Sequence, residues 1–276
     1  MKYLFLCLII LFVVSCGDDF KKVETLGEFR ILSVVTTTPE VAPGTGVSLQ
    51  LFVSDVKGGG RPIRGTTIAC IDPGIAFGAK VNCDHDPSAS PGTYDIHTAN
   101  DAGLGLGNLF TGLAPAVTNV TVPAGIFLGR STTEQFNGVS YIVIFNFTVD
   151  GREVSAFKRI IATNRGILKL NNNPSGSTIS QNGIAPGPVL NKDDELQVTT
   201  DAPEVYDFIN SEGATETKTE TFQVAWFVTQ GKFSKPKSNV DEIVEYQGDT
   251  PTVPSLVVSI VRDDRGGVEI VRESFP

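Results

Sequence analysis

Short runs of β-branched and aromatic residues, separated by Gly, Pro, Asn and Asp, occupy almost the whole chain beyond Gly27. The clearest run is Val47–Ser54, where every second residue from Val47 is Val or Leu, so that these residues share one face of an extended strand. No segment carries a convincing helical period of 3.6 residues. Regular short strands without intervening helices are typical of sheets packed face to face, and the sequence therefore predicts an all-β sandwich.

The strongest predicted hairpin joins 141–149 to 153–162 through Asp150-Gly151, a favoured two-residue turn. The other predicted strands are 29–36, 63–70, 117–122, 196–199, 221–229, 256–261 and 268–272. Two prolines in 38–44 restrict that segment to the edge of a sheet. Long irregular connections are expected at 100–116 and 206–218, where loops could present a binding surface.

The length fits two domains, because domains commonly contain roughly 100 to 150 residues and the chain has 276. We predict the first domain at 29–164 and the second at 165–276. Strand alternation groups Trp226 with Val224 and Val228, which predicts that this Trp lies on the core face of the second domain.

The first 15 residues have the composition of a secretory leader. One Lys precedes an apolar run at 3–14, which is too short to span a bilayer. The sequence Val13-Val14-Ser15-Cys16 resembles the lipobox of bacterial lipoproteins. That resemblance implies cleavage of a signal peptide at 1–15, acylation of Cys16 with fatty acids such as palmitate, and a tether at 16–28. Gly17 rather than Asp follows the Cys, which implies sorting to the cell outer membrane. The alternative is an ordinary signal peptide with an incidental Cys.

Cysteine usage fits an oxidising cell envelope. With Cys7 in the leader and Cys16 lipidated, Cys70 and Cys83 remain and are predicted to form a disulfide. The alternative is a metal site near these cysteines, with weak candidate ligands Asp84, His85, Asp86, Asp95 and His97. Their spacing matches no established zinc pattern, so we interpret the segment as a solvated polar loop and expect no metal or cofactor.

Two further acidic clusters have the same alternatives. A calcium site could use Asp263 and Asp264, but the following glycines favour a tight hairpin. The cluster at 192–195 is interpreted as a solvated loop.

Charge and motifs argue against nucleic acid and against catalysis. The chain has 22 basic and 31 acidic residues, a net charge of −9 that repels phosphate backbones. It contains no Gly-x-Ser-x-Gly elbow, phosphate-binding glycine loop or zinc-protease motif. We expect a protein that is not an enzyme.

Three segments carry a further resemblance: Pro39–Gly44 (PEVAPG), the Trp-containing strand at 224–231, and Arg262–Val268 (RDDRGGV). They resemble bacterial surface lipoproteins with tandem immunoglobulin-like domains. The resemblance implies two tandem immunoglobulin-like β-sandwich domains and an envelope location, and it brings no catalytic residues.

Three hypotheses for function follow. The first is a monomeric, lipid-anchored, non-enzymatic module that binds another envelope or surface protein. The second is a structural spacer or a subunit of an envelope complex. A carbohydrate-binding module or hydrolase is less favoured, because one Trp and five Tyr offer few rings for stacking on sugars.

Overall fold

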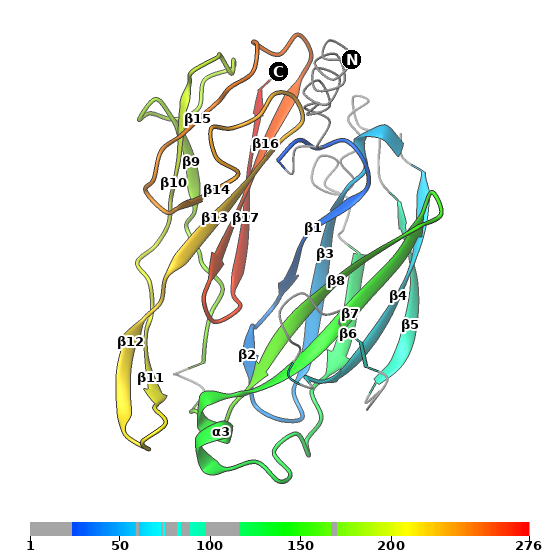
Figure 1. Ribbon diagram of the computed structural model, residues 1–276, viewed down its shortest axis with the longest axis vertical. Coiled ribbons are helices and arrows are strands. Elements are labelled where there is room, and N and C mark those ends of the chain that lie inside the picture. The colour runs from blue at the N-terminus through cyan, green and yellow to red at the C-terminus, as the bar shows by residue number, and fades with distance from the viewer. Residues whose placement is uncertain are drawn as a thin grey trace, which may run out of the picture.

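The computed structural model describes residues 24–58, 61–72, 74, 82–83, 89–97, 116–166 and 170–275, with the backbone alone at 62, 89–97 and 116. Nearly all regular structure in these residues is β-strand (Figure 1). The prediction of an all-β fold built from packed sheets is confirmed. Among the residues described, no helix has the length and apolar character needed to cross a membrane.

A five-stranded and a three-stranded sheet form the N-terminal part of the structure, which we call the N-terminal sheet pair. The five-stranded sheet has the order β2-β8-β7-β4-β5. Its strands are β2 (Glu40–Val41), β4 (Pro62–Ile71), β5 (Ala89–His97), β7 (Val139–Val149) and β8 (Arg152–Ala162). The three-stranded sheet has the order β1-β3-β6, with β1 (Arg30–Thr36), β3 (Gly46–Ser54) and β6 (Ala116–Thr121). A short 3-10 helix, η1 (Val56–Gly58), follows β3.

A first hydrophobic core lies between these two sheets. The alternating Val and Leu residues of β3 are at most 1% exposed and pack with Tyr141, Val143 and Phe145 of β7. The period of two that is visible in the sequence therefore separates the buried face of β3 from its other face.

The C-terminal sheet pair also contains two sheets. One has the order β14-β13-β16-β17 and the other the order β15-β10-β9. The strands are β9 (Thr178–Gln181), β10 (Glu195–Thr199), β13 (Phe222–Val228), β14 (Lys237–Asn239), β15 (Val244–Glu245), β16 (Ser255–Asp263) and β17 (Val268–Phe275). Trp226 is 1% exposed in the second core and its Nε1 donates to Ser238 Oγ at 2.9 Å, which confirms its predicted core position.

A third apolar cluster joins the two sheet pairs. Leu32 and Phe52, from β1 and β3, pack against Val258 and Ile260 of β16. The β1-β3-β6 sheet is therefore apolar on both faces, and the molecule is a stack of four β layers (Figure 1). The tandem immunoglobulin-like interpretation and the boundary between 164 and 165 stay predictions.

Several local predictions are confirmed. The turn at Asp150-Gly151 joins β7 to β8 with φ values of 53° and 73°, as a type I′ hairpin requires. The proline-rich segment forms the two-residue edge strand β2, parallel to β8.

One local prediction is wrong, and one element was not predicted. The segment 206–218 is not an irregular loop, because it contains the antiparallel hairpin β11 (Val205–Ile209) and β12 (Thr215–Thr219). A short helix, α3 (Thr132–Asn137), lies beside this hairpin, and the sequence interpretation missed it (Figure 1).

The end of the predicted tether is part of the folded body. Leu26 is 2% exposed in the third cluster, its N–H donates to Val228 O at 2.8 Å, and Val228 N–H donates to Glu24 O at 2.9 Å. Residues 24–26 therefore pack along β13, which corrects the assignment of the whole of 16–28 to a free tether.

Candidate functional site

A cavity of about 650 Å³ lies where the two sheet pairs meet. We call it the cleft. Its lining comes from β1, from 156–161 of β8, from the turn between β16 and β17, and from Tyr206 and Phe208 of β11. Ligand sites commonly have volumes of about 300 to 1,000 Å³, so the cleft is large enough for a small molecule or a peptide segment.

One wall of the cleft is formed by residues of β8 that extend beyond its short neighbour, β2. Pro39 and Pro43 flank β2 and have no N–H to donate, which limits the hydrogen bonding of this edge strand to β8. As a result β2 covers only Ile161 and Ala162 at the end of β8. The preceding residues of β8 form a wall of the cleft.

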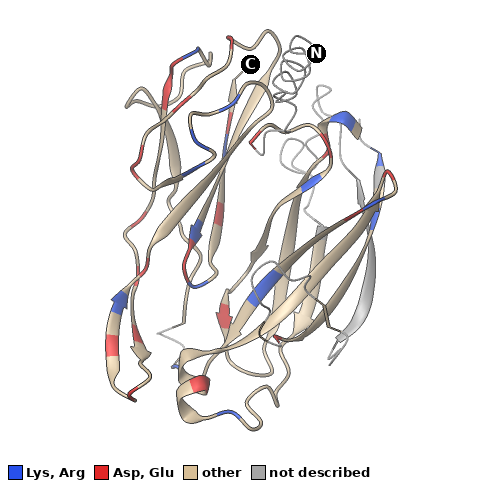
Figure 2. Cartoon of the chain, viewed as in Figure 1, with Lys and Arg blue, Asp and Glu red and all other residues tan. Residues whose placement is uncertain are grey.

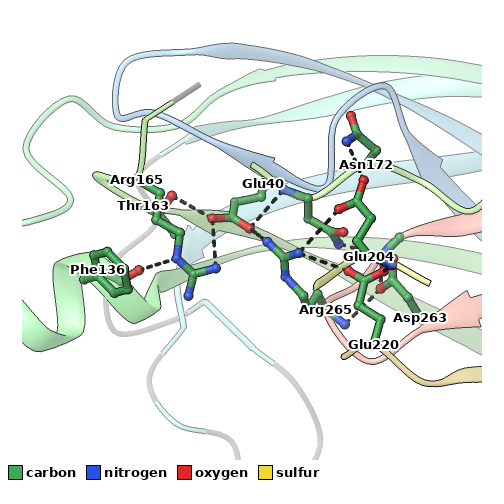
Figure 3. A network of polar contacts seen from close by, with 11 residues as sticks. Glu40, Phe136, Thr163, Arg165, Asn172, Glu204, Glu220, Asp263 and Arg265 are labelled. Atoms are coloured by element: carbon green, nitrogen blue, oxygen red, sulfur yellow. Dashed lines mark hydrogen bonds and ion pairs between the residues drawn. The ribbon is translucent and has the colours of Figure 1, made fainter. Parts of the chain in front are cut away.

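The floor of the cleft holds a cluster of buried ion pairs, which we call the Arg265 network (Figure 3). Arg265 forms ion pairs with Glu40 and, at 3.0 Å, with Glu220. Glu204, more exposed, lies 3.5 Å from the same guanidinium. The Arg265 guanidinium also covers the ring of Tyr206 at 4.5 Å. Arg265 therefore connects β2 and the β16–β17 turn to the residues on either side of the hairpin formed by Val205–Ile209 and Thr215–Thr219.

Glu40 is the second centre of this network. Its carboxylate accepts a hydrogen bond from Thr163 Oγ1 at 2.8 Å and one from Asn171 N–H at 3.1 Å. Arg165 lies 3.7 Å away and donates its Nε to Phe136 O at 2.9 Å. The Glu40 side chain is 2% exposed, so these contacts satisfy a carboxylate that water does not reach.

Burial shifts the acid–base behaviour of the network. Burial, together with the nearby Asp263 charge, raises the pKa of Glu220 to about 7. Burial also raises the pKa of Asp263. Carboxylates outnumber guanidinium groups around Arg265, so Glu220 gains a proton more readily than an exposed Glu does.

Two other cations line the cleft, Lys158 of β8 and Arg262 of β16. Lys158 is 7% exposed, and its Nζ donates to the main-chain carbonyl of Gly266. Arg262 donates Nη2 to the carbonyl of Leu32 at 3.2 Å. Burial lowers the pKa of Lys158 to about 8 and lowers the pKa of Arg262. Figure 2 shows basic segments on β8 and at the end of β16.

The two remaining cysteines form the predicted disulfide. Cys70 and Cys83 are joined with their Cα atoms 5.6 Å apart, and both are at most 1% exposed. They pack with Ile142 and Ile144 of β7 in a small cluster separate from the first core.

The other predicted site residues are placed only in part. Cys16, Asp84, His85 and Asp86 lie outside the described residues. Asp95 and His97 lie two positions apart in β5, at the edge of the five-stranded sheet opposite β2. Within the described part of the chain, no group of three potential metal ligands comes together.

The two acidic clusters that the sequence offered as cation sites are used in other ways. Asp263 accepts main-chain N–H groups from Arg265 at 2.9 Å and Gly267 at 2.6 Å, and so closes the β16–β17 turn. Asp194 is buried rather than solvated, and it accepts hydrogen bonds from Asn182 and from the Asn191 N–H. The solvated-loop interpretation of 192–195 is therefore wrong for Asp194.

Sequence reasoning did not find the Arg265 network. Glu40 and Arg265 both lie in segments that the sequence singled out, PEVAPG and RDDRGGV, but there the segments were interpreted only as an edge strand and a turn. Their ion pair joins positions separated by 225 residues. A charged residue in each motif was the available signal, and it did not identify the partner.

Comparisons with known proteins give no functional lead. No protein family model matches the chain, and no curated protein matches it significantly. The similar solved structures include the YadV chaperone, with 12% identity and a TM-score of 0.25, covering 88% of this chain and 100% of that one.

Two larger proteins also show a similarity. They are Escherichia coli alpha-2-macroglobulin activated by porcine elastase (9% identity, TM-score 0.25, 93% of this chain and 22% of that one) and dimeric latent PorU from Porphyromonas gingivalis (10%, 0.24, 91% and 24%). The chain thus spans about a quarter of each of these two proteins. TM-scores this low support no argument about fold or function.

Proposed function

We propose that this protein is a lipid-anchored, non-enzymatic binding module of the bacterial cell envelope, with the cleft as its binding surface. The cleft is the observation that carries the binding role. It is a concave site with aromatic side chains on one wall and a fixed polar floor, and recognition sites commonly have this composition.

The proposed location in the cell envelope rests on the leader and on the disulfide. The Cys70–Cys83 bridge is the kind of bond that forms in oxidising compartments such as the bacterial periplasm. Acylation of Cys16 would anchor the protein without a spanning helix. Glu24 already packs on the folded body, so the eight residues from Cys16 would reach at most about 30 Å. The end of the folded body that carries Glu24 would then stay close to the outer membrane.

Tandem immunoglobulin-like sandwiches fit this role. Each sheet pair has its own core, and such domains commonly present binding surfaces on a rigid framework. The proposal places the module boundary between 164 and 165.

A non-enzymatic role is supported by the way the cleft uses its ionisable groups. Arg165, Arg265, Glu40 and Glu220 are engaged with one another beneath the surface, where they stabilise the junction of the two sheet pairs. His97 lies in β5, at the far edge of the sheet from the cleft.

A structural spacer is the second candidate, and the third apolar cluster favours it. Leu32, Phe52, Val258 and Ile260 pack the two sheet pairs against each other, so the molecule has the rigidity that a spacer needs. A spacer and a binding module share the same anchor, and ligand binding in the cleft distinguishes them.

The anchor is tested with Cys16→Ala, using Cys7→Ala as the matched control, because Cys7 belongs to the leader that is removed. We expect wild-type protein and the Cys7 variant to incorporate radiolabelled palmitate and to fractionate with the outer membrane. The Cys16 variant should do neither. An unmodified mature amino terminus in mass spectrometry of the native protein would refute the proposal.

Protease treatment of intact cells tests on which side of the outer membrane the protein lies. Digestion of the wild-type protein indicates an outward-facing module with access to surface partners. Protection of a membrane-bound protein indicates a periplasmic module, with envelope proteins as its partners.

A further inference from the structure

The wall of the cleft formed by β8 has main-chain N–H groups that no described strand pairs with, although Gly266 of the β16–β17 turn approaches the Arg159 carbonyl. Ile161 and Thr163 direct their N–H groups to the β2 segment, at 2.9 Å from Pro39 O and Val41 O. Backbone groups repeat every two residues along a strand, so the N–H groups of Phe157 and Arg159 point to the same side, away from β7. In the described part of the chain, only β7 and β2 pair with β8, and β2 ends before these residues.

The opposite wall, β1, is less open. Its carbonyl at Leu32 accepts the Arg262 guanidinium at 3.2 Å, and its carbonyl at Thr36 accepts Asn173 Nδ2 at 2.8 Å. Side chains from the C-terminal sheet pair therefore occupy acceptors that a strand adding to β1 would need. An incoming strand has its free partner in β8.

Charge in the cleft is unbalanced at two positions. Arg159, Arg165 and Arg265 each form an ion pair with a carboxylate. Lys158 and Arg262 instead donate to main-chain carbonyls, and neither takes part in an ion pair within the described residues.

Asp263 does not serve as an ion-pair partner of Lys158. Asp263 contributes to the electrostatics of Lys158 but lies beyond ion-pair distance from it. Its oxygens accept the N–H groups of Arg265 and Gly267 and the amide of Asn171. Two half-buried or buried cations that face one cavity are complementary to an added carboxylate.

Strand alternation relates the N–H groups of β8 that lack a strand partner to the cation at Lys158. Lys158 projects from the face of β8 that also carries the core residues Ile160 and Ala162, whereas Phe157 projects from the other face and is 40% exposed. Side chains of an added strand would alternate in the same way. One would face Lys158, and its neighbours would lie beside Phe157.

Building on the proposed function, we propose that the cleft binds an extended acidic peptide segment of another envelope or surface protein. The segment adds to the free edge of β8 and places an Asp or Glu side chain between Lys158 and Arg262. Main-chain hydrogen bonds would supply the general affinity, and the carboxylate would supply the selectivity.

The test uses the full-length mature protein in detergent and a pool of end-blocked hexapeptides that alternate Val, Ile and Thr. Each peptide is made with one central Glu and again with Gln in its place. We expect the Glu peptides to bind at least about tenfold more tightly than their Gln partners. We also expect Lys158→Met to remove this difference, while Lys237→Met, at an exposed position on β14, keeps it.

Amide hydrogen exchange locates the bound peptide. Bound Glu peptide should slow exchange of the Phe157 and Arg159 amides and leave the amides of β14 unchanged. The proposal is overturned if no Glu peptide binds at millimolar concentration, if Glu and Gln peptides bind equally, or if protection falls elsewhere. Such results leave the anchoring result for Cys16→Ala as it stands, so the failure of this inference is distinct from the failure of the anchor.

Discussion

At the scale of single residues, Arg265 forms ion pairs with three carboxylates, those of Glu40, Glu204 and Glu220. Its guanidinium contacts Glu40 and Glu220, whose side chains are each 2% exposed. Removing one partner of a buried ion pair leaves an uncompensated charge, which commonly costs about 3 to 5 kcal/mol. We therefore expect Arg265→Met to lower the free energy of unfolding in urea by about that amount.

Arg130→Met is the control for this prediction. Arg130 forms an exposed ion pair with Glu134 at 3.1 Å, and exposed pairs contribute about 0 to 1 kcal/mol. Similar losses for the two variants would contradict a structural role for the Arg265 network.

Glu220 gives the network a pH dependence. Its folded-state pKa of about 7 lies above the value of about 4.3 expected in the unfolded chain. The folded state therefore binds more protons between these values, and the contribution of Glu220 to stability falls as pH rises from about 4.3 through 7. Glu220→Gln, which resembles the protonated acid, should match wild type at pH 3 and exceed its free energy of unfolding by about 3 to 4 kcal/mol at pH 8. A constant difference across this range would contradict the assignment.

Lys158 makes the free energy of unfolding depend on pH in the opposite direction to Glu220. Burial lowers its folded-state pKa to about 8, below the value of about 10.4 in the unfolded chain. The unfolded state binds more protons between these values, so stability rises with pH across this window. We expect Lys158→Met to gain about 2 to 3 kcal/mol at pH 7, with the gain shrinking by pH 10.

Denaturant titrations of Lys158→Met and Lys237→Met at both pH values check this. If Lys158→Met loses stability at pH 7, its hydrogen bond to Gly266 outweighs the cost of burying the charge. A stability gain would mean that the native residue is retained at a cost, as residues in binding sites often are.

At the scale of elements, hydrophobic pattern decides which strands the sequence can show. β3 shows a clear alternation and the β7–β8 hairpin has two long apolar strands around an Asp-Gly turn, and both were predicted within two residues of their observed bounds. β12 is exposed along its whole length and carries no apolar pattern, so the sequence does not predict its pairing with β11.

The short helix α3 had a sequence signal of a different kind. Ser131 Oγ accepts the Glu134 N–H at 3.2 Å, and Glu134 accepts the Ser131 N–H at 2.8 Å, which together form a capping box. Six residues are too few to show a helical period, but Ser-x-x-Glu alone marks where the helix begins.

Loss of this cap should weaken two elements. Asn137, at the end of α3, exchanges hydrogen bonds with the Ile209 main chain at 2.7 and 2.8 Å. We expect Ser131→Ala to cost about 1 kcal/mol and to speed amide exchange in both α3 and β11. Faster exchange confined to α3 would show that the hairpin does not depend on the helix.

At the scale of the whole molecule, the site arises from contacts that no local pattern contains. Glu40 follows β1 and Arg265 follows β16, and they meet only because the third apolar cluster packs the sheet pairs together. The sequence predicted the buried faces of β3 and β13 and the turns at Asp150-Gly151 and at 263–267, but alternation reports only that a face is buried and not what covers it. The outer faces of β1 and β16 could not be matched in advance, and neither could the cleft beside them.

This third cluster makes a prediction about cooperativity. Ile260 and Val261 are neighbours in β16 and both are 0% exposed, but Ile260 belongs to the cluster between the sheet pairs and Val261 to the second core. Each truncation to Ala should lower the free energy of unfolding, by about 2 to 5 kcal/mol for Ile260→Ala. Because Ile260 supports the junction, its truncation should also split one thermal transition into two, whereas Val261→Ala should keep a single transition at lower temperature.

Calorimetry distinguishes these outcomes through the ratio of the van't Hoff to the calorimetric enthalpy, which should fall for Ile260→Ala and not for Val261→Ala. Two transitions already present in wild type would mean that the sheet pairs unfold independently. In that case the ion pairs of Arg265 and the packing of Ile260 would be too weak to couple them. A single transition in both variants would place the coupling in the Arg265 network, and Arg265→Met should then separate the two transitions.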